Sequence, residues 1–162
     1  MAKKVAFFGV FASLAIIISY IERLFPLPIP LPGVKLGLAN VVVVVAMYVV
    51  SVRAALAISV IRIVIVGFLF GSIFSIAYSI VGGLASFFVM VLAKKVGFFG
   101  IVGVSVLGGV FHNIGQIFVA ALIVQNMRLF YYSPALIIAG VVTGCAIGFA
   151  AGHSINYLKQ MH

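Results

Sequence analysis

Long apolar runs, separated by short polar or proline-containing segments, make up most of the chain. A helix needs roughly 20 mostly apolar residues to cross the hydrocarbon core of a bilayer. We therefore expect an all-α integral membrane protein, built as one compact bundle of six transmembrane helices in a single domain, 1–162. The expected spans cover residues 5–21, 36–51, 54–70, 73–92, 100–124 and 135–157.

The composition excludes an ordinary soluble domain, because 66% of the residues are hydrophobic and only 7% are charged. The net charge of +9 does not indicate a nucleic-acid partner, since the basic residues are scattered between apolar runs instead of forming one solvated face. The expected surroundings of the chain are therefore a lipid bilayer.

The basic residues predict the orientation of the bundle. Cytoplasmic loops of membrane proteins carry an excess of Lys and Arg. With both termini on the cytoplasmic side, that side receives Lys3, Lys4, Arg53, Lys94, Lys95 and Lys159, and the outer side receives Arg23, Lys35 and Arg128. We therefore expect both termini to be cytoplasmic and the proline-rich segment 26–32 to be external.

Arg62 lies inside the apolar run ISVIRIVIVGFLFG. A guanidinium stays protonated in proteins, and a charge within a membrane span is costly and indicates a functional site. The chain has one acidic residue, Glu22, which lies near the end of a different expected span. We expect amides, carbonyl groups, water or an anionic ligand to satisfy Arg62.

Few other polar side chains fall within membrane depth. His112 and Gln116 are four residues apart, so they share a helix face, and Asn113 lies beside it. We expect this stripe to face Asn40 and Arg62 across the bundle, because buried polar groups need hydrogen-bond partners. The candidate substrate-binding residues are Arg62, His112, Asn113, Gln116, Asn40 and Lys35, with Lys35 at the rim.

This set suits a small polar or anionic molecule in a pocket open to the outside. The alternative interpretation is a structural network whose members satisfy one another. Catalysis is not expected, because a magnesium site needs carboxylates and the chain has no Asp. His153 and His162 fall near the cytoplasmic end, far from His112, so we expect no metal ligands and no cofactor.

Small residues recur along the first expected span. Ala2, Ala6, Gly9 and Ser13 form a stripe on which another membrane helix could pack closely. We regard them as candidate partner-docking residues. The alternative is packing inside the bundle, which we expect for most other small-residue pairs, such as Gly140 with Gly144.

Three segments carry a resemblance to a known family: PGVKLGLAN (32–40), SVIRIVIVGFLFGSIFS (59–75) and GVFHNIGQIFVA (109–120). The chain resembles the Gx transporter family, also called heptaprenyl diphosphate synthase component I, which is similar to the substrate-binding S-components of energy-coupling factor (ECF) transporters. The resemblance implies six transmembrane helices in the bacterial inner membrane and an outward-facing substrate pocket. It also implies a membrane scaffold protein and two cytoplasmic ATPases as partners.

From the residues and the resemblance we expect a membrane substrate-binding and uptake protein of the S-component type. One alternative is a non-catalytic accessory subunit of polyprenyl diphosphate or quinone synthesis, which would hold a soluble prenyl transferase at the membrane. The chain lacks the paired Asp-rich motifs of prenyl transferases, so it is not expected to be the enzyme itself. A second alternative is a stand-alone carrier for a small solute.

Overall fold

The computed structural model describes residues 2–24 and 37–160, apart from the side chains of residues 2–4 and 23. Lys35 and the prolines of segment 26–32 lie outside the described residues. The described part forms six α-helices and one 3-10 helix. They are α1 (Ala2–Leu24), α2 (Asn40–Val49), α3 (Val52–Phe70), α4 (Ile73–Val96), α5 (Ile101–Val124), η1 (Met127–Tyr132) and α6 (Ser133–Gln160).

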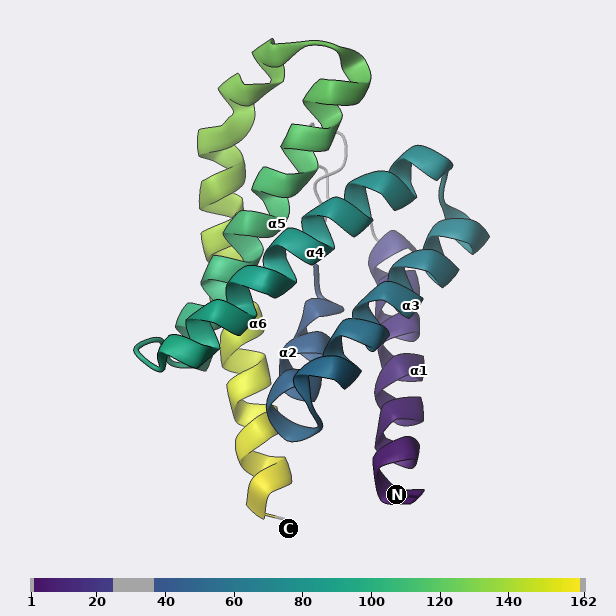
Figure 1. Cartoon of the computed structure of the whole chain (residues 1–162), viewed down its shortest axis with the longest axis vertical. Coiled ribbons are helices and arrows are strands. Elements are labelled where there is room, and N and C mark those ends of the chain that lie inside the picture. The colour runs from purple at the N-terminus through teal and green to yellow at the C-terminus, as the bar shows by residue number, and fades with distance from the viewer. Residues whose placement is uncertain (1, 25–36, 161–162) are drawn as a thin grey trace.

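Five of the described helices, α1, α3, α4, α5 and α6, are long and apolar enough to cross a membrane. The predicted all-α membrane bundle is thereby confirmed. The first residues of α1 and the last residues of α6 lie at the same end of the bundle, which we call the lower end (Figure 1). The ends of α2 and α4 and the start of α3 also lie toward it (Figure 1).

Helix α2 differs most from its prediction, because it has ten residues where the span 36–51 was expected. At 1.5 Å per residue it is about 15 Å long, half the thickness of a bilayer core. Gly37 adopts a left-handed backbone conformation with φ +68°, and Asn40 N donates to Gly37 O at 2.7 Å. This turn starts the helix. Ser51 then caps the next helix by accepting from Ala54 N at 3.1 Å, so the chain reverses after Val50.

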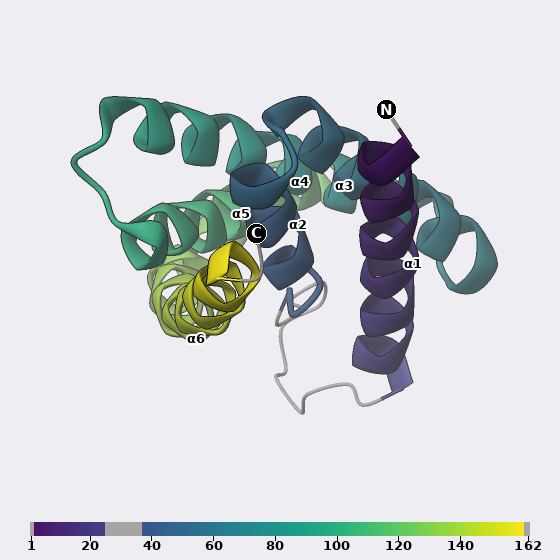
Figure 2. The same ribbon diagram turned by 90° about the horizontal axis from the view of Figure 1, so that it is seen from below.

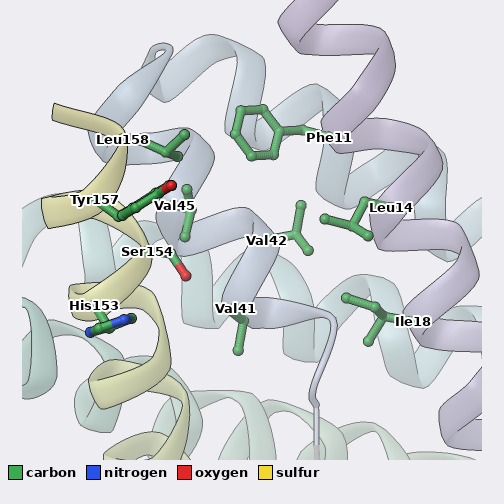
Figure 3. A pocket seen from close by; sticks show the side chains of 10 residues that line it. All are labelled: Phe11, Leu14, Ile18, Val41, Val42, Val45, His153, Ser154, Tyr157 and Leu158. Carbon is green, nitrogen blue, oxygen red and sulfur yellow. The ribbon is translucent and has the colours of Figure 1, made fainter. Parts of the chain in front are cut away.

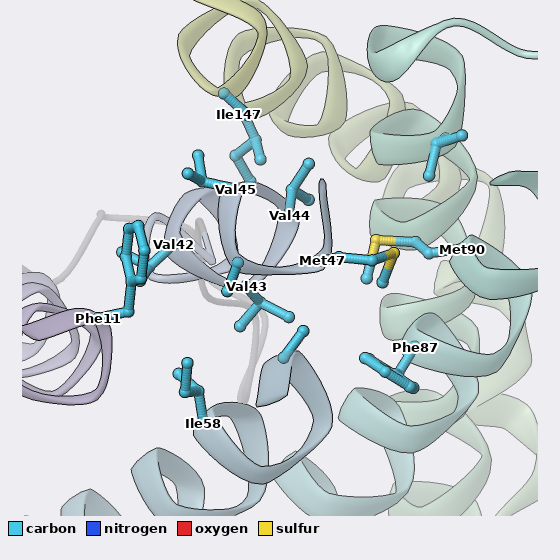
Figure 4. Close-up of a cluster of buried hydrophobic side chains, with 14 of the residues drawn as sticks. Phe11, Val42, Val43, Val44, Val45, Met47, Ile58, Phe87, Met90 and Ile147 are labelled. Carbon is cyan, nitrogen blue, oxygen red and sulfur yellow. The ribbon is translucent and has the colours of Figure 1, made fainter. Parts of the chain in front are cut away.

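The short helix α2 lies at the centre of the bundle, between α1 and α6, when the molecule is viewed from its lower end (Figure 2). Its residues 42–47 are all buried. Around it pack Phe11 from α1, Ile58 from α3, Phe87 and Met90 from α4, and Ile147 from α6 (Figure 4). Within a membrane such a core is stabilised mainly by close van der Waals packing, because lipid tails are as apolar as these side chains.

Helices α4, α5 and α6 approach one another through glycine. A Cβ added at Gly115 would lie 2.9 Å from Gly82 Cα of α4, and one at Gly144 would lie 2.6 Å from Val106 Cα of α5. Distances this short leave no room for a side chain. The α6 pair Gly140 and Gly144 therefore packs inside the bundle, as expected from the sequence.

Candidate functional site

Arg62 lies midway along α3 and is buried, with 8% of its surface exposed. Its Nη1 donates to Ser19 Oγ of α1 at 3.4 Å, and its Nη2 donates to Asn40 Oδ1 of α2 at 3.1 Å. Its Nε is buried and has no hydrogen-bond partner among the described residues. The guanidinium of Arg62 thus joins α3 to α1 and α2, while its Nε has no partner within the described part of the chain.

The contacts of Arg62 continue into a closed ring. Asn40 N donates to Gly37 O, and Gly37 N donates to Glu22 Oε1 at 2.5 Å. Glu22 and Ser19 are three residues apart on α1, so they share one face of that helix. The ring therefore runs from Ser19 through Arg62, Asn40 and Gly37 to Glu22, and α1 closes it. We call these five residues the Arg62 network.

Two sources of positive potential meet at the Arg62 network. The guanidinium is one, and the other is the start of α2, because the N-terminus of a helix carries a partial positive charge. Glu22 is the single acidic side chain of the sequence, and its attraction reaches Arg62. The hydrogen bonds of the guanidinium nevertheless go to neutral oxygens of Ser19 and Asn40.

The predicted stripe on α5 is buried but contacts other helices. Asn113 Nδ2 donates to Leu136 O of α6 at 2.8 Å. His112 and Gln116 lie against α4, where a Cβ added at Gly82 would come within 3.3 Å of His112 Nδ1 and 2.8 Å of Gln116 Cγ. The structure thus brings Asn40 to Arg62, as predicted, while the contacts described for the three α5 residues are with α4 and α6.

Ser19 was missed by the sequence analysis. A serine in an apolar helix usually donates to a carbonyl of its own preceding turn, as Ser13 Oγ does to Gly9 O at 3.0 Å. The available signal was the spacing from Glu22, since both residues occupy one face of α1. A polar residue three positions before the only carboxylate indicates that this face of α1 turns toward other polar groups of the bundle.

The predicted docking stripe lies on the exposed side of α1. Ala6, Gly9 and Ser13 are all exposed, and a Cβ added at Gly9 would meet nothing within 4 Å. These residues therefore do not pack inside the described bundle. Ala2 belongs to α1, but its side chain lies outside what the structure describes.

The fold and the Arg62 network define a multi-pass α-helical membrane protein with a buried, positively charged polar site. A family model described as heptaprenyl diphosphate synthase component I matches residues 11–154. The chain therefore belongs to this family, and the match includes all five residues of the Arg62 network. No match was found among curated proteins or among solved structures.

Proposed function

We propose that this protein binds a small anionic molecule at the Arg62 network and serves in its uptake across the bacterial inner membrane, in the manner of an ECF S-component. The observation that carries the proposal is the buried Arg62 guanidinium, whose Nε has no partner among the described residues. Leaving a buried donor unsatisfied costs about 1–3 kcal/mol, and more for a charged group. A ligand oxygen would remove this cost.

The chemistry of the network favours an anion as the ligand. A guanidinium presents five N–H donors in a planar fork, which matches a carboxylate or phosphate in a two-bond geometry. The start of α2 adds the backbone dipole that commonly favours anions at helix N-termini. The present partners of Arg62, a hydroxyl and an amide oxygen, are weaker acceptors than an anionic oxygen and can be exchanged for it.

Under this proposal, His112, Asn113, Gln116 and Lys35 are further candidates for ligand contact. Energy for uptake would come from a scaffold protein and two cytoplasmic ATPases, since the sequence has no Walker A motif of its own. The small-residue stripe of Ala2, Ala6, Gly9 and Ser13 is the candidate docking face for the scaffold.

The test is native mass spectrometry of the gently solubilised protein, compared with the Arg62→Gln variant. Glutamine keeps a donor for Asn40 but removes the charge. We expect a small anionic molecule to remain with the wild type and to be lost from the variant. Arg53→Gln is the matched control, because Arg53 is exposed at the start of the same helix. A folded Arg62→Gln protein that retains the molecule as the wild type does would overturn the proposal.

A second function is favoured by the family match. The description "component I" implies a second component, and we propose as the alternative that the chain is a non-catalytic membrane subunit which holds a soluble prenyl transferase at the membrane. Affinity purification from a native membrane separates the two proposals. Recovery of a prenyl transferase without ATPases supports the accessory subunit, and recovery of two ATPases with a membrane scaffold supports uptake.

A further inference from the structure

The 3-10 helix η1 joins α5 to α6 at the end of the bundle opposite the two termini (Figure 1). None of its six residues is buried, and Met127, Tyr131 and Tyr132 expose 65%, 85% and 50% of their surface. Helices of the 3-10 type have poorer hydrogen-bond geometry than α-helices and rarely exceed about four residues. A turn of six unburried residues therefore needs stabilisation from outside the described bundle.

The depth of η1 in a bilayer follows from α5. This helix has 24 residues and carries no Lys, Arg, Asp or Glu from Ile101 to Val124. At 1.5 Å per residue it is about 36 Å long, which exceeds the roughly 30 Å of a hydrocarbon core even at the usual tilt of about 20°. Gln125 ends the helix in a left-handed conformation, and the polar Asn126 follows it. A crossing by α5 therefore places η1 in the headgroup layer.

Side chains pair backbone groups at both ends of η1. Asn126 Oδ1 accepts from Arg128 N at 3.0 Å, and Ser133 Oγ donates to Phe130 O at 2.7 Å. Leu129 N also donates to Asn126 O at 3.3 Å. An unpaired polar group costs free energy in apolar surroundings, so these bonds lower the cost of moving the turn out of bulk water. The turn is therefore suited to shallow burial among lipid headgroups.

One edge of η1 combines a cation with an aromatic ring. Residues three apart in a 3-10 helix lie one above the other, so Arg128 and Tyr131 share an edge, and both are exposed. No Asp or Glu occurs in the sequence from Ile101 to Gln160, so the hairpin of α5 and α6 supplies no carboxylate to Arg128. Arginine near a helix end extends to the membrane surface, where a phosphate can accept two of its hydrogen bonds.

Another open apolar surface of the bundle is a groove between α1 and α6, with α2 as its floor (Figure 3). Its volume is about 490 Å³, and Phe11, Leu14 and Ile18 of α1 face Tyr157 and Leu158 of α6 across it (Figure 3). No Lys or Arg is among the described residues that line this groove. A lipid headgroup in the groove would therefore find no charge-assisted contact, in contrast to one at η1.

We propose that η1 anchors the α5–α6 hairpin in the headgroup layer, with Tyr131 among the headgroups and Arg128 bound to the phosphate of an anionic phospholipid. Tyrosine favours this layer because its ring is apolar and its hydroxyl is polar. A two-fold contact between copies through η1 is disfavoured, because it would bring two Arg128 guanidinium groups together. The anchor is independent of both candidate functions, since an uptake protein and an accessory subunit would each cross the membrane with this hairpin.

The sequence contains no tryptophan, so Tyr131→Trp gives a full chain with one tryptophan whose fluorescence reports on η1. The protein is placed in phosphatidylcholine vesicles whose acyl chains carry bromine, a quencher, either near the headgroup or near the middle of the bilayer. We expect the shallow bromine to quench Tyr131→Trp more than the deep one. Phe111→Trp is the control with the opposite order, because Phe111 is exposed in the middle of α5. Met127→Trp serves the same purpose where Tyr131→Trp fails to fold.

Two results would overturn the anchor. Quenching of Tyr131→Trp by iodide in the water, without quenching by brominated lipid, would show that the turn lies in bulk solvent. Protection from both quenchers would show that protein covers η1, either a second copy of this chain or another partner.

The role of Arg128 is tested by comparing brominated phosphatidylglycerol with brominated phosphatidylcholine, each at the same mole fraction in phosphatidylcholine vesicles. One arginine at a membrane surface is expected to enrich the anionic lipid about fivefold around Tyr131→Trp. Addition of Arg128→Gln should abolish this enrichment. Arg53→Gln is the matched control and should keep it, because Arg53 is exposed at the start of α3 and not on η1. Equal quenching by the two lipids, or enrichment that survives Arg128→Gln, would overturn the anionic-lipid site.

Discussion

Arg62 Nη2 donates to Asn40 Oδ1 at 3.1 Å, which ties the middle of α3 to the first residue of α2. Asn40 is also the residue whose N–H closes the turn with Gly37 O. A single asparagine thus takes part in starting a helix and in holding a buried cation. Any ligand that competes for Arg62 acts directly on the start of α2.

Replacing Asn40 by aspartate separates the binding role of Arg62 from its structural role. A carboxylate at this position would form an ion pair with Arg62 and would favour the helix N-terminus. We expect the melting temperature of Asn40→Asp to equal or exceed that of the wild type, while retention of the small anionic molecule falls. Asn40→Ala should instead lower the free energy of unfolding by about 1–3 kcal/mol. If Asn40→Asp retains the molecule fully, an anion site at Arg62 is contradicted.

Gly37 should not tolerate a side chain, for two separate reasons. Its φ of +68° disfavours other residues by about 1–2 kcal/mol, and an added Cβ would lie 3.0 Å from Asn40 Nδ2. Gly97 has a similar φ of +72° but nothing within 4 Å of such a Cβ. Gly97→Ala therefore measures the backbone cost alone. We expect Gly37→Ala to lower the melting temperature more than Gly97→Ala, and equal losses would argue against a tight turn at Asn40.

Two glycines of α6 should respond to alanine with opposite signs. A Cβ at Gly144 would meet the α5 backbone, whereas one at Gly152 would meet nothing within 4 Å. Alanine in an open helical position is favoured over glycine by about 0.5–1 kcal/mol. Thermal unfolding in detergent should therefore show Gly144→Ala destabilised and Gly152→Ala slightly stabilised. A neutral Gly144→Ala would mean that α5 and α6 are not in backbone contact.

The exposed stripe of α1 can be tested without disturbing the bundle. Gly9→Leu adds a large side chain where the structure has open space, so we expect an unchanged melting temperature. If the stripe docks a membrane partner through close backbone contact, co-purification of that partner should fall. Val10→Leu is the control, since Val10 is also exposed but is not a small residue. Equal recovery of the partner with both variants would exclude the stripe as a docking face.

The sequence predicts helices most accurately where capping and turn residues fix their ends. Ser72 accepts from Ser75 N at 3.2 Å and starts α4 at the predicted residue. The prediction for α2 was too long, because a continuous apolar run does not show where the left-handed turn at Gly37 lies. The short central helix follows from backbone geometry that hydropathy alone does not encode.

The candidate site was predictable in part. Arg62 and Asn40 stand out because each is a polar residue in an apolar run. Ser19 resembles an ordinary helical serine in the sequence, and Glu22 was assigned to the edge of its span. The partners of His112 and Gln116 depend on the rotation of α5, which is set by the close approach at Gly82. Such rotations are decided by packing between helices that are distant in sequence.

Helix α2 accepts a hydrogen bond from a basic side chain near each of its ends. Arg62 donates to Asn40 at its start, and Lys94 donates to Met47 O near its end. An anion bound by Arg62 would take the place of Asn40 as its partner, so the first turn of α2 would be held by packing and by the turn at Gly37 without this hydrogen bond. Binding of an anion at Arg62 would thus change how the central helix α2 is held at its first residue.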